Sequence, residues 1–220
     1  MKIYRITIII IIVLFSGLFT GCRERGVKGS GKVITEQREI EEFSGIKVSG
    51  AYNINIVVGS TTSLSITAED NLQSYITSEV VNEKLIIENT RNILPKRKII
   101  IEISTTDLEE IFSSGISNIY AEGIDEQNFF VELKRAGVIE LFGKVEMLEA
   151  DISGAALLDS RELYARFVDI DIDGSAKAEV YISEKLTADL SANGSIDYYG
   201  DPLEVVVDNS GVGSVNKREY

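Results

Sequence analysis

The residue types best suited to chemistry in this sequence are the aspartates of one short alternating stretch, "VDIDIDGSAKAEV" (168–180). Its acids and its glycine stand where an EF-hand calcium loop places its first ligands and its turn: Asp169, Asp171, Asp173 and Gly174. That loop also needs a bidentate glutamate at its twelfth position, which is Val180 here, with Glu179 one place early. Neither flank shows helical spacing, so we interpret the stretch as a β-strand with its apolar residues inward and its aspartates outward.

Aspartates that recur from repeat to repeat could still form a cation site. The candidate metal ligands are Asp151, Asp171 and Asp173, with Asp169 and Asp189 nearby. Two carboxylates about 5 Å apart repel by about 1 kcal/mol even in water, and a bound Ca²⁺ would relieve that repulsion. Three interpretations stay open: a solvated acidic face, a weak Ca²⁺ site, and a calcium-dependent polysaccharide-processing enzyme with Lys134 or Arg135 as base.

Other catalytic chemistry is restricted by what the chain lacks. The 220 residues contain no histidine and one cysteine, Cys22. Serine–histidine and cysteine–histidine nucleophiles, histidine bases and most zinc sites are therefore excluded. No cofactor is expected apart from the Ca²⁺ considered above, and a non-enzymatic protein is favoured. The net charge of −13 also argues against nucleic acid as a partner.

Tyrosines form a second candidate binding surface. In "IDYYGDP" (196–202) the repeat described below places Tyr198 inward and Tyr199 outward, and Tyr181 is expected on a neighbouring repeat. Exposed tyrosines on a flat sheet can stack on sugar rings, so Tyr199 and Tyr181 are candidates for glycan stacking. Strand propensity and structural stacking explain the same residues equally well.

The elements that must position these residues recur along the chain. Glycines with a shared context stand at Gly50, Gly115, Gly137, Gly154, Gly174, Gly194 and Gly211. Most have an apolar residue four places before and four places after, which predicts a strand, a bend and a second strand in each unit. Units of about 20 residues suit coils that stack and share one core. We therefore predict an all-β, parallel β-helix-like β-solenoid in which Ile170, Leu190 and Val207 are vertically aligned.

The expected domain is single and spans 33–217, with N-terminal strands over 33–104, regular repeats over 105–217 and a tail at 218–220 that caps the stack. Period-two alternation predicts strands over 46–58, 63–68, 84–89 and 98–104. The stretches 70–76 and 105–111 each open with a capping residue and are the expected single helical turns.

The first residues have the features of a secretory signal. Two positive charges in "MKIYR" precede an apolar run, and small residues precede Cys22, which predicts a lipoprotein signal peptide over 1–21. "LFTGC" (18–22) resembles the lipobox of bacterial lipoproteins, in which the cysteine is acylated, although Phe19 replaces the usual leucine. An acylated Cys22 would hold the protein on a membrane. A basic, Gly-rich linker, expected to be flexible, follows over 22–32.

Two further stretches carry a family resemblance. "EEFSGIKVSGAYNINIVVGSTTSLSITAEDNLQSYITSEVVNEKLII" and "DLEEIFSSGISNIYAEG" resemble the putative auto-transporter adhesin, head GIN domain family. The resemblance implies a secreted or lipid-anchored envelope protein of Gram-negative bacteria, built as a β-solenoid, with no established catalytic motif. Together with the signal, Cys22, the repeats and the absence of histidine, this favours an adhesin-like module, lipid-anchored at the outer membrane, that binds a glycan or an envelope or host-surface protein. The calcium-dependent polysaccharide enzyme and a passive structural lipoprotein are the alternatives.

Overall fold

The computed structural model describes residues 26–219, in which β-strands form nearly all of the regular structure. The strands are β1 (Val27–Lys28), β2 (Val33–Arg38), β3 (Gly45–Ser49), β4 (Asn53–Val58), β5 (Ser63–Glu69), β6 (Ile76–Val81), β7 (Lys84–Asn89), β8 (Ile93–Leu94), β9 (Ile100–Thr105), β10 (Glu110–Ser113), β11 (Asn118–Gly174), β12 (Lys177–Leu190), β13 (Ser195–Tyr199), β14 (Glu204–Asn209) and β15 (Ser214–Lys217). The predicted all-β class is confirmed. The predicted signal peptide, Cys22 and the first part of the predicted linker lie outside the described residues.

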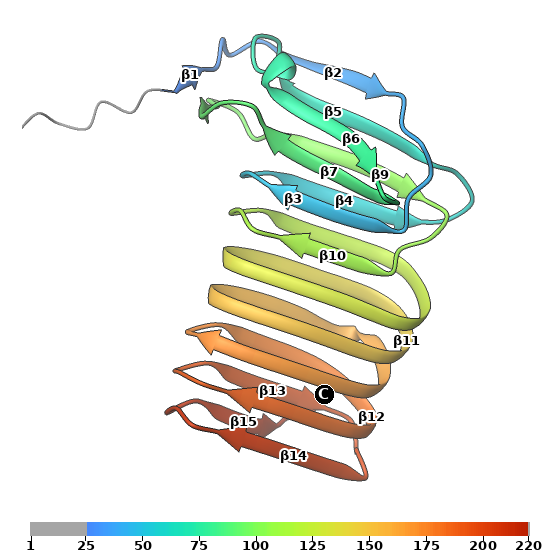
Figure 1. The fold of residues 1–220 in the computed structure, drawn as a ribbon, viewed down its shortest axis with the longest axis vertical. Coiled ribbons are helices and arrows are strands. Elements are labelled where there is room, and N and C mark those ends of the chain that lie inside the picture. Colours follow the sequence, from blue (N-terminus) through green and yellow to red (C-terminus); the bar gives the residue numbers. More distant parts are fainter. Residues whose placement is uncertain (1–25, 220) are drawn as a thin grey trace, which may run out of the picture.

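From β3 and β10 onward the chain winds into coils that lie one below another, which we call the stack (Figure 1). Neighbouring coils pair in parallel, as between β10 and β11, β11 and β12, and β12 and both β13 and β14. Several side-chain hydrogen bonds between coils join residues 19 or 20 apart, such as Ser160 Oγ to the carbonyl of Glu179 and Ser210 Oγ to the carbonyl of Leu190. This spacing agrees with the predicted coil of about 20 residues.

The core runs along the inside of the stack because each coil turns alternate residues inward. Ile46, Ile111 and Val131 are aligned on successive strands and are fully buried. Each such side chain contributes about 1.5–3 kcal/mol of burial free energy. Below them, β14 is exposed along its whole length, because no further coil of residues 26–219 covers it.

Antiparallel strands close the upper end of the stack (Figure 1). β5 pairs antiparallel with β2 and β9, and β6 pairs antiparallel with β7. The predicted helical turn at 70–76 is present as the short 3₁₀ turn η1 (Gln73–Tyr75). No helix of the described chain has the length and apolar character needed to span a membrane.

The helical turn predicted at 105–111 is wrong. Thr105 ends β9, residues 107–109 are irregular, and β10 begins at Glu110. The buried Thr105 hydroxyl donates to the carbonyls of Phe43 (3.0 Å) and Asp107 (2.9 Å). A threonine side chain that bonds nearby backbone groups offers the chain a turn in place of a helix.

The predicted alignment of Ile170, Leu190 and Val207 is wrong by two residues at its centre. Ala188 stands between Ile170 and Val207, whereas Leu190 pairs with Ile172. On the second strand of the coil, Ile196 pairs with Ala178, and Tyr198 pairs with Val180. A slip of two residues leaves every side chain on the same face, so the apolar pattern could not reveal it.

The slip arises at the bend between the two strands of a coil, where the recurring glycines lie and which we call the glycine corner. A Cβ on Gly194 would contact the carbonyl oxygen of Ala176, whereas one on Gly211 would contact that of Ala192. Gly194 and Gly211 therefore occupy two different positions of the corner. Spacings between glycines overestimated one coil and underestimated the next.

One corner position is filled by an arginine in a backbone conformation that favours glycine. Arg135 has φ 80°, and a Cβ on Gly154 (φ 90°) would lie 2.3 Å from the Arg135 carbonyl oxygen. Residues other than glycine rarely adopt this left-handed conformation. The corner thus forces a strained conformation on Arg135 and exposes its side chain to solvent.

Candidate functional site

The predicted cation ligands share one groove on the outside of the stack. The groove, which we call the acidic groove, has a volume of about 430 Å³. Its polar lining is Glu132, Lys134, Asp151, Ser153, Asp171, Asp173, Asp189 and Ser191. The parallel register places Asp171, Asp189 and Asp208 on successive coils. Asp189, and not Ser191 two residues later, pairs with Asp171 because of the slip described above.

The charges of the acidic groove are largely uncompensated within the described residues. Lys134 Nζ pairs with Glu132 (2.7 Å), and Ser191 Oγ donates to Asp173 Oδ1 (3.1 Å). No described lysine or arginine forms an ion pair with Asp151, Asp171 or Asp189. Partial burial, followed by the negative charges of Asp171 and Glu132, raises the pKa of Asp151.

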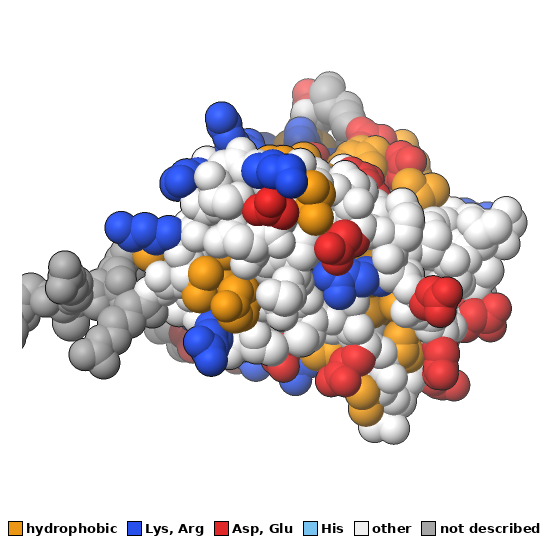
Figure 2. Space-filling view, turned by 90° about the horizontal axis from the view of Figure 1, so that it is seen from above, with side chains coloured by type: hydrophobic (Ala, Val, Ile, Leu, Met, Phe, Trp, Pro, Cys, Tyr) orange, Lys and Arg blue, Asp and Glu red, His pale blue; other side chains and the backbone are white. Residues whose placement is uncertain are grey.

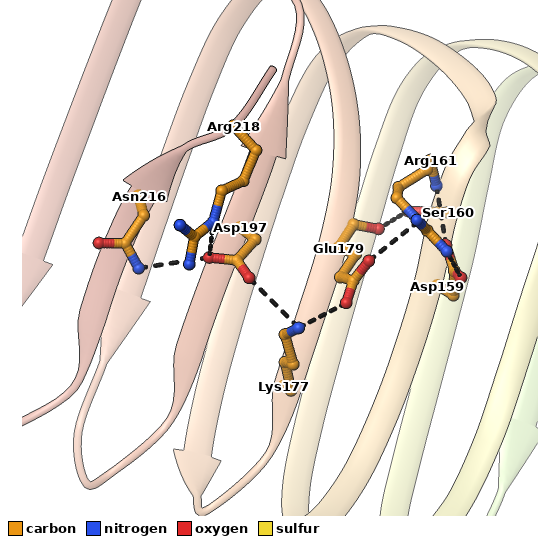
Figure 3. Close-up of polar contacts among 8 residues, drawn as sticks. All are labelled: Asp159, Ser160, Arg161, Lys177, Glu179, Asp197, Asn216 and Arg218. Atoms are coloured by element: carbon orange, nitrogen blue, oxygen red, sulfur yellow. Dashed lines mark hydrogen bonds and ion pairs between the residues drawn. The ribbon is translucent and has the colours of Figure 1, made fainter. Parts of the chain in front are cut away.

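Elsewhere on the stack, three aligned acids and an asparagine have positively charged partners, unlike the aspartates of the acidic groove. Asp159, Glu179, Asp197 and Asn216 are aligned on successive coils. Figure 3 shows the cations between them, which with these residues form what we call the ion ladder. Arg161 and Lys177 each bridge two neighbouring acids, and Arg218 pairs with Asp197.

Distances within the ion ladder are those of direct pairs. Arg161 reaches Asp159 Oδ2 at 2.6 Å and Glu179 Oε2 at 2.9 Å. Lys177 Nζ lies 2.5 Å from Glu179 and 3.2 Å from Asp197. Partial burial alone would raise the pKa of Asp197, but hydrogen bonds from Arg218, Lys177 and Asn216 lower it. The fold can therefore place lysine and arginine side chains beside stacked acids. In the acidic groove, Asp151, Asp171 and Asp189 have no such partner among the described residues.

The tightest acidic cluster of the described residues is elsewhere. Asp107, Glu109 and Glu126 bring one carboxylate oxygen each within 4.8 Å of one another, a spacing that no other described trio of acids meets. Burial, a hydrogen bond with Asp107 and the charges of Asp107 and Glu109 raise the pKa of Glu126 to about 7. A cation at Asp151, Asp171 and Asp173 would therefore require side-chain movement. Glu126 could not be predicted from the sequence because its partners, Asp107 and Glu109, belong to another coil.

The predicted tyrosines lie together. Tyr181 pairs with Tyr199 in the parallel register and with Tyr164 on the other side. The rings of Tyr164 and Tyr181 meet edge to face, with centroids 4.9 Å apart, and Arg161 lies 5.9 Å from the Tyr199 ring centre. Tyr164 is 51% exposed, whereas Tyr181 and Tyr199 are half-buried. We call these three residues the tyrosine ladder.

One neighbouring residue was not predicted, and one predicted residue lies elsewhere. Tyr164 was missed because a register shift between Ser160 and Tyr164 moves it opposite Tyr181. Arg135 was expected near the aspartates as a possible base. Arg135 instead lines a separate groove of about 370 Å³ that also contains Arg91. Lys134, the other candidate base, lies in the acidic groove.

Known structures share this fold. A putative adhesin from Bacteroides fragilis has a TM-score of 0.70 and 20% identity, and the match covers 88% of this chain and all of that one. A putative lipid binding protein from Parabacteroides distasonis has a TM-score of 0.58 and 22% identity, with 88% and 100% covered. A putative adhesin from Parabacteroides merdae has a TM-score of 0.53 and 22% identity, with 88% and 99% covered. At these identities the likeness shows the fold alone.

Comparison with protein families gives a firmer assignment. A search of curated proteins found no match to this chain. The profile described as "Putative auto-transporter adhesin, head GIN domain" matches residues 42–202, which include the acidic groove and all but the last members of the ion ladder. The resemblance inferred from the sequence is thereby confirmed: the chain belongs to the putative auto-transporter adhesin, head GIN domain family.

Proposed function

We propose that this protein is a non-enzymatic, adhesin-like binding module of the bacterial cell envelope, in which a parallel β-helix-like β-solenoid presents the acidic groove to a ligand. The observation that carries the proposal is the unpaired run of Asp171 and Asp189 beside a fully paired ion ladder. Stacked like charges cost free energy in a free protein, and a cationic or Ca²⁺-bridged ligand removes that cost on binding. The tyrosine ladder is the second proposed contact, suited to a sugar ring.

The test is a binding screen on the chain from residue 22 with Cys22→Ser, which keeps every described residue. Glycan and envelope-protein or host-surface-protein arrays are probed with and without Ca²⁺. We expect a ligand whose affinity falls at least tenfold in the Asp171→Asn/Asp189→Asn double variant. Glu39→Gln/Glu41→Gln is the matched control, since both glutamates are exposed and lie on another part of the chain. Equal binding by both double variants would reject the groove, and a ligand-free protein would point to a passive structural lipoprotein.

We also propose that Cys22 is acylated and anchors the protein at the outer membrane. The small residues before Cys22 and the apolar run before them support this proposal. Mass spectrometry of the N-terminal peptide from a membrane fraction tests it, with diacyl or triacyl Cys22 as the expected species. Cys22→Ser should release the protein from the membrane fraction. An unmodified Cys22 in membrane-bound protein would reject the anchor.

A further inference from the structure

We infer that the anchored end of the molecule carries a docking surface for anionic lipid headgroups, an inference that rests on the proposed lipid anchor. Its members, which we call the basic patch, are Lys28, Lys32, Arg91, Lys96, Arg97 and Lys98. All six side chains belong to exposed residues. Such a group of positive charges is unusual in a protein whose net charge is −13.

The fold assembles this patch from two segments far apart in the sequence. β1 pairs in parallel with β8, so that Lys28 lies beside Leu94. The amide of Gly29 continues the pairing by donating to the Leu94 carbonyl (3.0 Å). The basic run 96–98 directly follows β8, and Arg91 directly precedes it. The start of the described chain and the basic run are thus neighbours in space.

A buried carboxylate holds both segments in place. Glu69, at the end of β5, is only 1% exposed. Its Oε1 accepts the amide of Gly31 (2.5 Å), and its Oε2 accepts the amide of Lys96 (2.8 Å). A carboxylate that accepts two backbone amides forms strong hydrogen bonds to each. Residues 29–32 are therefore fastened to the body at the base of the basic run.

The charges of the patch are available to an outside partner. Lys32 lies 3.5 Å from Asp70, and Arg91 lies 5.9 Å from the centre of the Tyr75 ring. Within residues 26–219, no carboxylate forms an ion pair with Lys28, Lys96, Arg97 or Lys98. In the view from above, most of the lysine and arginine side chains lie in the left half, the side of β1 in Figure 1, and most acids lie in the right half (Figure 2).

The anchor brings this surface to the membrane. Even fully extended, the chain from Cys22 to Gly26 spans at most about 14 Å. Charges attract an anionic surface within a Debye length, about 8 Å at physiological ionic strength. An acylated Cys22 would therefore hold the basic patch close to this range, whereas the acidic groove lies on later coils, mainly in β11 and β12. The patch and the anchor would together set the orientation of the stack.

Vesicle sedimentation tests the inference on the unacylated chain from residue 22 with Cys22→Ser. The buried core lies entirely within residues 43–196, so this chain retains the whole folded body. The probes are vesicles of phosphatidylcholine alone and of phosphatidylcholine with 30% phosphatidylglycerol, at 50 and 500 mM NaCl. We expect at least tenfold stronger partitioning onto the anionic vesicles at low salt, which 500 mM NaCl abolishes.

Two triple variants with equal charge change separate the patch from net charge. Lys96→Gln/Arg97→Gln/Lys98→Gln should lower partitioning at least tenfold, whereas Lys144→Gln/Arg166→Gln/Lys185→Gln should stay within twofold of the parent. Thermal unfolding of both variants checks that they remain folded. Equal losses in the two variants or no preference for phosphatidylglycerol would overturn the inference. The assay uses no acyl chain, so its failure is distinct from a failure of Cys22 acylation or of the ligand screen.

Discussion

At the scale of single residues, the corner of the coil imposes the sharpest requirement. Gly154 has φ 90°, and an added Cβ would lie 2.3 Å from the Arg135 carbonyl oxygen. We expect Gly154→Ala to destabilise the protein by about 2–4 kcal/mol, because strain and steric overlap act together. Gly59→Ala is the matched control, since nothing lies within 4 Å of its Cβ position. Urea unfolding measures both, and equal stabilities for the two variants would contradict this account of the corner.

Arg135 makes the complementary prediction. Its left-handed backbone costs about 1 kcal/mol or more, while glycine at this position costs about 0.5–1 kcal/mol of additional chain entropy. Because the two effects nearly cancel, we expect Arg135→Gly to change the free energy of unfolding by less than about 1 kcal/mol, in the stabilising direction. Arg135→Ala keeps the left-handed strain and controls for loss of the side chain. A marked destabilisation in the glycine variant alone would show that the corner does not need this conformation.

Glu126 gives a prediction of pH dependence. Its pKa is raised to about 7 in the folded protein, chiefly by burial and by Asp107. Between the ordinary glutamate pKa and pH 7, the folded protein therefore keeps a proton on Glu126 that the unfolded chain has released. The stabilising contribution is complete below the ordinary glutamate pKa and is lost as pH rises through about 7. The stability of the parent relative to Glu126→Gln should therefore fall between pH 5 and pH 8. Glu39→Gln, at an exposed site, should show no such trend, and a constant difference for Glu126→Gln would refute the raised pKa.

At the scale of the element, the two stacked acidic sets predict opposite mutational effects. Asp197 is 6% exposed and accepts from Arg218, Lys177 and Asn216, so Asp197→Asn should destabilise by about 1–2 kcal/mol. Its pKa is lowered, so its contribution is present above the ordinary aspartate pKa and is lost as pH falls. Asp189 lies between Asp171 and Asp208 on adjacent strands, so Asp189→Asn should stabilise by about 0.5 kcal/mol at low salt. Thermal unfolding at neutral pH compares the pair, and the same sign for both would remove the contrast that marks the groove.

The same elements show how far the sequence could predict the structure. Period-two alternation located the strands within 46–58, 63–68, 84–89 and 98–104, although the first range contains two strands, β3 and β4, and it did not report β2 or β6. It also placed Asp151, Asp171 and Asp173 on one outer surface. Register was not predictable, because a two-residue slip at Leu190 leaves inward and outward sides unchanged. The shift before Tyr164 has another cause: the offset between paired residues changes from 20 (Ser160 and Val180) to 17 (Tyr164 and Tyr181), and such a bulge interrupts the alternation. The clusters around Glu126 and Glu69 join residues from distant coils or strands, and no local pattern reports such contacts.

At the scale of the whole molecule, the stack is closed at one end and open at the other. Antiparallel strands cover the N-terminal end. At the other end, the tail contacts the side of the stack: the Arg218 amide donates to the Tyr198 carbonyl (2.8 Å), and its guanidinium donates to Asp197 (2.9 Å). Within the described residues β14 has one neighbouring strand, β12, and Val205 and Val207 are 40% and 43% exposed.

This asymmetry predicts a gradient of local stability along the stack. Coils in the middle are paired on both sides and share a buried core, whereas β14 gains from one side only, so it should open at a much lower free energy. Hydrogen exchange should therefore be fastest in β14 and slowest in the β11 coils around Ile170, which is fully buried. Ile170→Ala should cost about 2–5 kcal/mol, and Val207→Ala less than about 1 kcal/mol. Protection of β14 equal to that of β11, rising with protein concentration, would instead mean that a second copy covers the open coil in solution.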